Sequence, residues 1–275
     1  MNNWVESMGF LTDFSLSYLV NYTDYQLMNR YIILICVALV THTAQAQFEL
    51  LGAADYMPSG CILLTPNERY AEGIAYSTSK LNLQEYFEIE FDIYLGDKDD
   101  LGADGITFVI HDDPREFQAF GTYGEGIGYG RFNSNFISGN FIAPSVAVEF
   151  DTYQNAYQND PSSDHVAFLV NGSSFHTEYW NNEDQQFNLE DDQMHNFRFS
   201  WNPETYEIIV RLDNTIVYQG NKNLVKDIFN GNTEVIWGFT SSTGNKYNLQ
   251  YFCFRRIAYQ PSLNHAENHF NSEAE

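Results

Sequence analysis

Basic side chains are scarce in this sequence of 275 residues. Thirteen lysines and arginines stand against 37 aspartates and glutamates, which gives a formal net charge of −24. Proteins that bind nucleic acid or anionic membrane surfaces neutralise phosphates with clusters of lysine and arginine. No such cluster occurs here, so the composition argues against both partners. Strong acidity suits a secreted protein, or one that binds cations or neutral ligands.

Long apolar runs are also missing. The apolar segment 31–40 is too short to span a bilayer as a permanent helix. It follows Arg30 and precedes an Ala-Gln-Ala site at 44–46, an order typical of a signal peptide, with a buried strand as the alternative. We therefore predict a signal peptide over 28–46, preceded at 1–27 by a mis-assigned start or an extension. The mature chain would be secreted, periplasmic or at the cell surface, without membrane insertion after signal removal.

Cysteine is rare, with three in the whole sequence. Cys36 lies within the predicted signal peptide, which leaves Cys61 and Cys253 in apolar segments near opposite ends of the mature chain. In an oxidising compartment an even pair of cysteines is expected to form a bridge. Two buried free thiols are the alternative. We favour a disulfide.

Helical periodicity is nearly absent between residues 48 and 259. Apolar and polar residues alternate with period two, and turn-forming residues separate the alternating segments. The predicted strands are 87–95, 105–112, 145–153, 165–172, 195–201, 206–213, 215–220, 235–242 and 249–259. A single short helix is predicted at 223–231. About a dozen strands without helical spacers predict an all-β fold of two antiparallel sheets packed face to face. We expect one domain over 47–260 and a flexible polar tail over 261–275.

The segment VEFDTYQNAYQNDPSSDH, which ends at His165, gathers ligand-type side chains at the end of a predicted strand. Glu149 and Asp151 are two residues apart, so they lie on the same face of the strand. The loop then adds Asn155 and Asp160. Bringing three carboxylates within about 4 Å costs on the order of several kcal/mol per pair unless a cation compensates the repulsion. The alternative is an extended, solvated loop that keeps the charges apart.

The ligand types indicate two kinds of ion. Carboxylates with one imidazole suit a borderline transition ion such as manganese, and Glu149 and His165 would complete that site. Carboxylates with an amide oxygen and a backbone carbonyl suit calcium, and Asn155 with the carbonyl of Tyr153 would complete that site. Two other carboxylates, those of Asp151 and Asp160, could bridge both ions.

This segment resembles the metal signature of the legume (L-type) lectins, in which the same residue types occur at the same spacing. The ADG sequence at 103–105 is similar to the family's carbohydrate-binding aspartate, which follows a cis peptide bond. GEGIGYG at 124–130 is similar to its glycine-rich sugar loop, and VIWGFTSSTG at 235–244 to its late strand and recognition loop. The order along the chain is also the family's. With its signal peptide, the sequence resembles exported bacterial members.

The resemblance implies a concanavalin-like jelly-roll β-sandwich and a lectin that binds a glycan or glycoconjugate. It implies manganese-type ligands at Glu149, Asp151, Asp160 and His165, and calcium ligands at Asp151, Tyr153, Asn155 and Asp160. It places the sugar contacts at Asp104, Gly124, Glu125, Gly126, Tyr153, Asn155, Asn245 and Lys246. The charge of Glu125 disfavours acidic sugars, so we expect a neutral one. A homo-oligomer is compatible with this interpretation.

Two other functions compete with a lectin. Jelly-roll glycoside hydrolases carry two glutamates in an E-x-D-x-x-E strand and need two carboxyl groups about 5 Å apart. Here Gln154 stands where the second glutamate would be, and an amide cannot donate the proton that the leaving group needs. We therefore predict that the protein is not an enzyme. A structural surface sandwich without sugar binding is the other alternative, against which Asp104 and Asn155 both argue.

Four further histidines show no ligand spacing, and we assign them no role. They are His176, His195, His265 and His269.

Overall fold

The structure is a computed structural model that describes residues 47–131, 140–181 and 187–260. The predictions for 1–27 and 28–46, and for the tail at 261–275, lie outside the described residues. Within the described part of the chain, no helix is long and apolar enough to cross a membrane.

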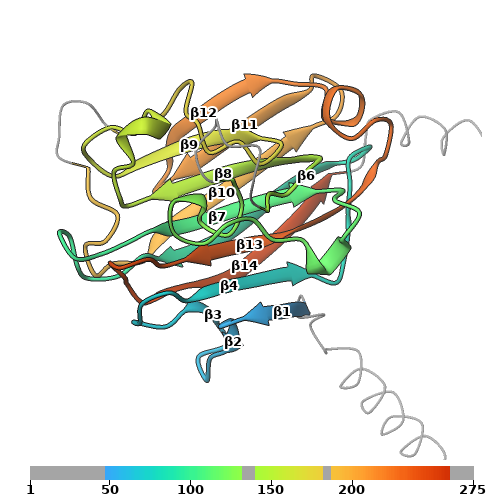
Figure 1. The fold of residues 1–275 in the computed structure, drawn as a ribbon. Helices are drawn as coiled ribbons and strands as arrows, with labels where there is room; N and C mark the ends of the chain where they lie inside the picture. The colour runs from blue at the N-terminus through green and yellow to red at the C-terminus, as the bar shows by residue number, and fades with distance from the viewer. Residues whose placement is uncertain (1–46, 132–139, 182–186, 261–275) are drawn as a thin grey trace, which may run out of the picture. The chain divides into compact units, whose positions relative to one another are not determined.

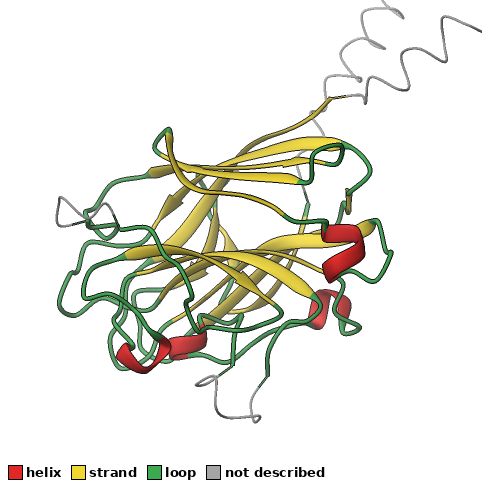
Figure 2. Ribbon diagram, turned by 90° about the horizontal axis from the view of Figure 1, so that it is seen from above, coloured by secondary structure: helices red, strands yellow, loops and turns green. Residues whose placement is uncertain are grey.

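The described chain forms two antiparallel sheets, which we call sheet 1 and sheet 2 (Figure 1). Sheet 1 contains, in spatial order, β1 (Phe48–Gly52), β4 (Glu72–Ser77), β13 (Glu234–Ser242), β7 (Gly105–His111), β8 (Ser145–Asp151) and β9 (His165–Val170), with β5 (Leu81–Asn82) beside β13. Sheet 2 contains β12 (Thr215–Asn221), β11 (Glu207–Leu212), β10 (His195–Asn202), β6 (Tyr86–Tyr94), β14 (Gln250–Gln260), β3 (Ile62–Thr65) and β2 (Asp55–Tyr56). Figure 2 shows the sheets as separate layers, which confirms the predicted all-β sandwich.

Helical structure is limited to four short turns in the described residues. Three are 3₁₀ turns, η1 (Glu116–Gln118), η2 (Gly124–Gly126) and η3 (Ala156–Gln158). The fourth, η4 (Leu224–Ile228), is a π-helical turn inside the segment predicted to be helical. Two of the turns, η2 and η3, lie in the loops that carry predicted site residues.

The main core lies between the two sheets and follows from the period-two pattern. In β6 the buried side chains alternate along the strand, with Phe87, Ile89 and Phe91 fully buried. The Phe91 ring contacts Phe108 of sheet 1 at a centroid distance of 6.0 Å. Each fully buried side chain of this size contributes about 1.5–3 kcal/mol of hydrophobic stabilisation. This packing holds sheet 1 firmly against sheet 2.

A second, smaller core covers the opposite face of sheet 1. It contains Tyr129 and Ile142 from the covering loops, and Ala147 of β8 and Leu169 of β9. All seven residues of β8 are consequently buried. Because side chains two apart share a face, Glu149 and Asp151 lie on the same side as Ala147. The loops therefore enclose charged groups that a two-layer sandwich would leave in water.

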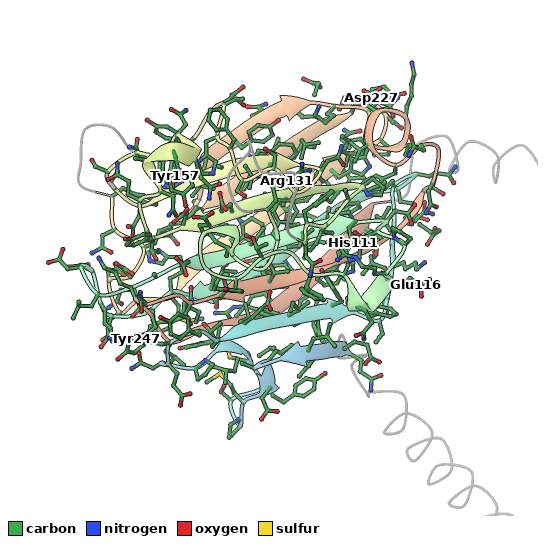
Figure 3. All side chains as sticks on the ribbon, in the orientation of Figure 1. His111, Glu116, Arg131, Tyr157, Asp227 and Tyr247 are labelled. Carbon is green, nitrogen blue, oxygen red and sulfur yellow. A yellow bond between two sulfur atoms is a disulfide. The ribbon has the colours of Figure 1, made fainter. Side chains whose placement is uncertain are left out.

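Four strands of sheet 1 bring separate loops to the same end of the sheet. In the antiparallel register Ser242 pairs with Gly105, Gly105 with Asp151, and Asp151 with His165. Asp104 stands immediately before Gly105. Loops that are far apart in the sequence thus meet at the same end of the sandwich. In Figure 3 Tyr157 and Tyr247 mark this end, and His111 and Glu116 mark the other.

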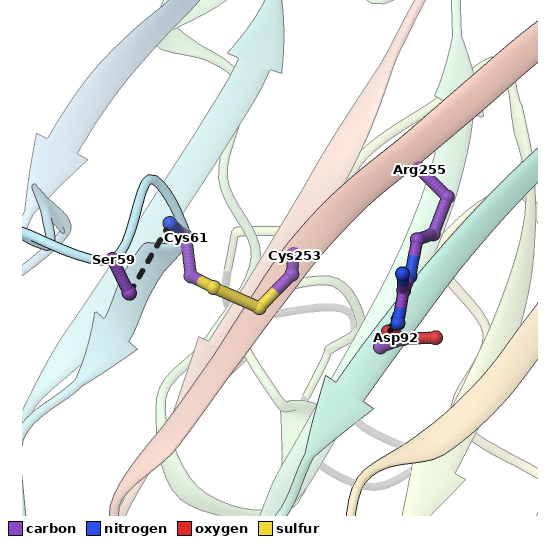
Figure 4. The surroundings of a disulfide bond; sticks show 5 residues. All are labelled: Ser59, Cys61, Asp92, Cys253 and Arg255. Atoms are coloured by element: carbon purple, nitrogen blue, oxygen red, sulfur yellow. Dashed lines mark hydrogen bonds and ion pairs between the residues drawn. A yellow bond between two sulfur atoms is a disulfide. The ribbon is translucent and has the colours of Figure 1, made fainter.

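Cys61 and Cys253 form a disulfide (Figure 4). Cys61 directly precedes β3 and Cys253 lies in β14, so the bond joins neighbouring strands of sheet 2. Next to it, the guanidinium of Arg255 donates to Asp92 of β6. The first and last parts of the described chain are therefore covalently tied across a separation of 192 residues.

Candidate metal centre and Asp104 site

The four residues expected to form the transition-metal site lie together and are buried. Glu149, Asp151, Asp160 and His165 are exposed by 1%, 3%, 8% and 1%. Nε2 of His165 lies 3.9 Å from Oδ2 of Asp151 and 4.0 Å from Oδ1 of Asp160. These separations are too long for hydrogen bonds, but they match two ligands of one ion at bond lengths of about 2.1 Å.

The loop between β8 and β9 is folded, not extended. Oδ1 of Asp151 accepts from the backbone N–H of Tyr153 at 2.7 Å, and Oδ2 of Asp160 accepts from that of Asn155 at 2.6 Å. After η3, Asn159 adopts a left-handed conformation with φ of 72° and reverses the chain. The two aspartates therefore shape the loop, and their remaining oxygens lie at its centre.

Burial disfavours the charged forms of the side chains in this cluster and shifts their pKa values. It raises the pKa of Glu149, and it raises the pKa of Asp151 further because Glu149 and Asp160 lie nearby. Burial and the neighbouring His176 lower the pKa of His165 to about 3, so His165 is neutral at physiological pH. Carboxylates beside a neutral imidazole form a donor set that a divalent cation would stabilise.

His176, which has no ligand spacing in the sequence, lies in this cluster. Its Nε2 lies 2.5 Å from Oε2 of Glu149, and its Nδ1 lies 2.8 Å from Oδ1 of Asp160. Burial disfavours the charged imidazole, but the two carboxylates outweigh this and raise the pKa of His176 to about 10. Sequence spacing missed it because the loop after β9 folds back over the cluster.

The residues expected to bind calcium share this loop. Asp151 and Asp160 are common to both proposed sites, and Tyr153 and Asn155 lie half-buried between them. The backbone N–H of Thr152 donates to the carbonyl of Asp104 at 3.0 Å. This bond fixes the start of the loop against the strand that carries Asp104. The carboxylate, amide and carbonyl oxygens available here fit the oxygen ligands that calcium prefers.

Asp104 is a buried carboxylate whose Oδ2 has no hydrogen-bond partner among the described residues. It follows a cis peptide bond after Ala103, as in the pattern that its ADG sequence resembles. A Cβ added at Gly124 or Gly244 would stand 3.9 Å or 3.5 Å from this oxygen. Glycine at both positions therefore leaves space beside it. Burial and the charge of Glu125 raise the pKa of Asp104 to about 7.

The glycine-rich loop is fixed on two sides. Oγ of Ser242 donates to the carbonyl of Gly124 at 3.1 Å. The loop between β8 and β9, which we call the metal loop, contains Gln158. The side-chain amide of Gln158 donates to the carbonyl of Glu125 at 3.1 Å. The loop with Gly124, Glu125 and Gly126 is thereby joined to both β13 and the metal loop.

The loop after β13 completes the surroundings of Asp104. The ammonium of Lys246 lies 4.9 Å from the centroid of the Tyr153 ring. The hydroxyl of Tyr70 hydrogen-bonds Oδ1 of Asn245. Sequence reasoning missed Tyr70, an exposed aromatic residue whose position in the chain carried no signal. The residues assigned to sugar binding thus come from four loops that converge near Asp104.

Comparison with known proteins identifies the class to which this fold and site belong. Residues 40–256 match the family model described as the legume lectin β-barrel domain. The chain belongs to this family.

Solved structures of legume lectins share the fold at low sequence identity. A lectin from Bauhinia forficata in complex with GalNAc is 19% identical, with a TM-score of 0.62, over 80% of this chain and 95% of that one. A metal-free form of lectin I-B4 from Griffonia simplicifolia is 18% identical, with a TM-score of 0.61, over 80% and 96%. Lectin II from Ulex europaeus is 18% identical, with a TM-score of 0.62, over 78% and 93%.

These findings settle the class of protein. As a member of this family, the chain is a protein of the lectin type and not an enzyme. The jelly-roll sandwich of two antiparallel sheets is the fold of its structural neighbours. The family assignment therefore excludes the glycoside hydrolase alternative, in agreement with the missing second glutamate.

Proposed function

We propose that the protein binds a neutral glycan at Asp104, and that calcium and a transition-metal ion order the loop beside it. The observation that carries the proposal is the free Oδ2 of Asp104, which is buried yet has no partner among the described residues. A buried polar atom without a hydrogen bond costs about 1–3 kcal/mol, and more if it is charged. A ligand that donates to this oxygen recovers that cost.

Sugar hydroxyls match the groups around Asp104. A hydroxyl both donates and accepts, so it can donate to Asp104 and accept from an amide such as that of Asn155. Tyr153 offers an aromatic ring to the apolar C–H face of a sugar. Lys246 already lies over this ring, so stacking would use its other face or displace the ammonium. Glu125 adds a negative charge, which supports a neutral sugar.

The ions would act on the protein and not on the sugar. Asp151 and Asp160 would hold them, and the same two side chains bind the backbone of the loop that carries Tyr153 and Asn155. Fixing this loop before the ligand arrives reduces the ordering cost of binding. The cations would also favour the ionised carboxylate of Asp104, which is the form that accepts two hydroxyl hydrogens.

The proposal includes a location outside the cytoplasm, secreted, periplasmic or at the cell surface. Two observations support it: the signal-like segment at 28–46, and the disulfide between Cys61 and Cys253, which is the chemistry of an oxidising compartment. Export by a bacterium and assembly into a homo-oligomer remain part of the same proposal.

A glycan array tests this function. The protein is applied with calcium and manganese, and again after chelation. Binding to a defined class of neutral glycans that chelation removes is the expected result. If protein that is shown to hold its ions binds no glycan on the array, the result would contradict sugar binding and favour a structural sandwich.

A further inference from the structure

His176 is held over the metal cluster by backbone contacts. Its backbone N–H donates to the carbonyl of Gln158 at 2.9 Å, and the side-chain amide of Asn159 donates to the His176 carbonyl at 2.8 Å. Further along, Trp180 and Val166 exchange a pair of backbone hydrogen bonds. These contacts attach the segment after β9 to the metal loop on one side and to β9 on the other. The position of His176 is therefore built into the fold.

The two imidazoles lie side by side and share the carboxylate of Asp160. The rings of His165 and His176 meet edge to face at 4.7 Å between centroids, and each side chain is 1% exposed. One set of donor atoms comes from Glu149, His165 and His176, and a second from Asp151, Asp160 and His165. Within each set the donor atoms lie within 4.8 Å of one another. His165 belongs to both sets, so the two sets are adjacent and together contain five side chains.

The surroundings of His165 point to an ion inside the cluster. The contacts of His176 to Glu149 and Asp160 leave His165 without a hydrogen-bond partner. Nε2 of His165 is indeed buried without a hydrogen bond in the described part of the chain. It lies about equally far from Asp151 and Asp160, at distances that an ion would bridge. A metal bound by both imidazoles would give Nε2 of His165 the partner that it lacks.

We propose that His176 is a direct ligand of the transition-metal ion, giving a centre of two imidazoles and three carboxylates. Relative to a centre with one imidazole, this donor set shifts the preference from Mn²⁺ toward Zn²⁺, because imidazole nitrogen suits zinc whereas oxygen ligands suit manganese. The inference deepens the metal part of the proposed function and does not depend on sugar binding.

Metal titration of the full chain tests this assignment. Protein stripped by a chelator and reloaded with calcium is titrated calorimetrically with Zn²⁺ and, separately, with Mn²⁺. We expect one site at which Zn²⁺ binds at least tenfold more tightly than Mn²⁺. Substitution His176→Gln should weaken Zn²⁺ binding at least tenfold and reduce the preference for zinc, and it should change the visible spectrum of the Co²⁺-loaded protein.

His195→Gln is the matched control, because His195 is also a largely buried histidine between two carboxylates, Asp191 and Asp213, but lies outside the cluster. It should leave Zn²⁺ affinity and the Co²⁺ spectrum unchanged. Thermal unfolding and calcium binding of both variants show that they are folded.

Two results would overturn the assignment. One is a folded His176→Gln protein with the Zn²⁺ affinity and Co²⁺ spectrum of the unsubstituted chain. The other is an unsubstituted protein that binds no transition metal while His176→Gln gains a site, which would make His176 a substitute for the ion. Neither readout uses sugar, so failure of the glycan proposal remains a separate result.

Discussion

At the scale of the residue, Asp104 combines burial with an unused hydrogen-bonding oxygen. Asp104→Asn keeps the shape of the side chain but removes its charge and one acceptor. We expect glycan affinity to fall at least about tenfold, since a hydrogen bond to a charged group contributes about 1.5–3 kcal/mol. Metal binding should be unchanged because Asp104 belongs to neither set of metal donors. Calorimetry with glycan and with metal measures both, and retained glycan affinity would refute this use of Asp104.

Glu190 is another buried carboxyl group, and it belongs to neither set of metal donors. It accepts from the side-chain amide of Asn248 at 2.7 Å, and burial together with the charge of Asp164 raises its pKa to about 9. Between the ordinary glutamate pKa of 4.5 and this raised pKa, the folded protein holds a proton that the unfolded chain has lost. The contribution of Glu190 to stability therefore falls as pH rises through that window.

Glu190→Gln removes this pH dependence while keeping a group that can hydrogen-bond Asn248. We expect the melting temperature of the variant to rise relative to the unsubstituted protein as pH is raised from 5 to 9. Thermal unfolding at several pH values measures the difference. A difference that is the same at both ends of the range would show that Glu190 is not protonated in the fold.

Some residues of the site could be identified from the sequence and others could not. Glu149, Asp151, Asp160 and His165 were identifiable because one strand and its following loop hold all of them at a fixed spacing. His176 was not, because only the tertiary path of the next loop brings it back. Tyr70 was missed for the same reason, because its contact with Asn245 in the loop after β13 joins segments far apart in the sequence.

At the scale of the element, the loop between β8 and β9 is the unit on which the site depends. Asp160→Ala removes a proposed ligand of both ions and also the acceptor for the backbone N–H of Asn155. We expect bound metal and glycan binding to be lost together, measured by metal analysis and glycan calorimetry. Asp227→Ala, which removes an exposed acid on η4, is the control. Glycan affinity that survives the loss of both ions in Asp160→Ala would separate the loop from sugar binding.

The described strands of six or more residues were predicted from the sequence, with the exception of β4. β6 and β11 bury every second residue over most of their length and were recognised. β4 is buried on both faces and has no alternating pattern, and β2 and β5 have two residues each. The second core under the loops could not be read from the sequence either, because loop residues carry no periodicity.

At the scale of the whole molecule, the disulfide restricts the unfolded chain. A bridge between residues 192 apart closes a long loop, and such bonds typically contribute about 2–5 kcal/mol. For a domain of this size that corresponds to a loss of roughly 4–20 °C in melting temperature on reduction. Scanning calorimetry with and without reductant measures it, and the double variant Cys61→Ser, Cys253→Ser should not respond to reductant. An identical melting temperature for reduced and oxidised protein would contradict this contribution.

The whole molecule carries a formal charge of −24, and three of its buried carboxylates, those of Glu149, Asp151 and Asp160, lie where the proposed ions would bind. The central claim is that these ions order the loop that binds sugar. Its most direct test is calorimetric titration of the best glycan from the array into metal-loaded, chelated and reloaded protein, with ion content measured in each sample. The account predicts binding in the first sample, none in the second and full recovery in the third. Undiminished affinity in the ion-free sample would contradict it.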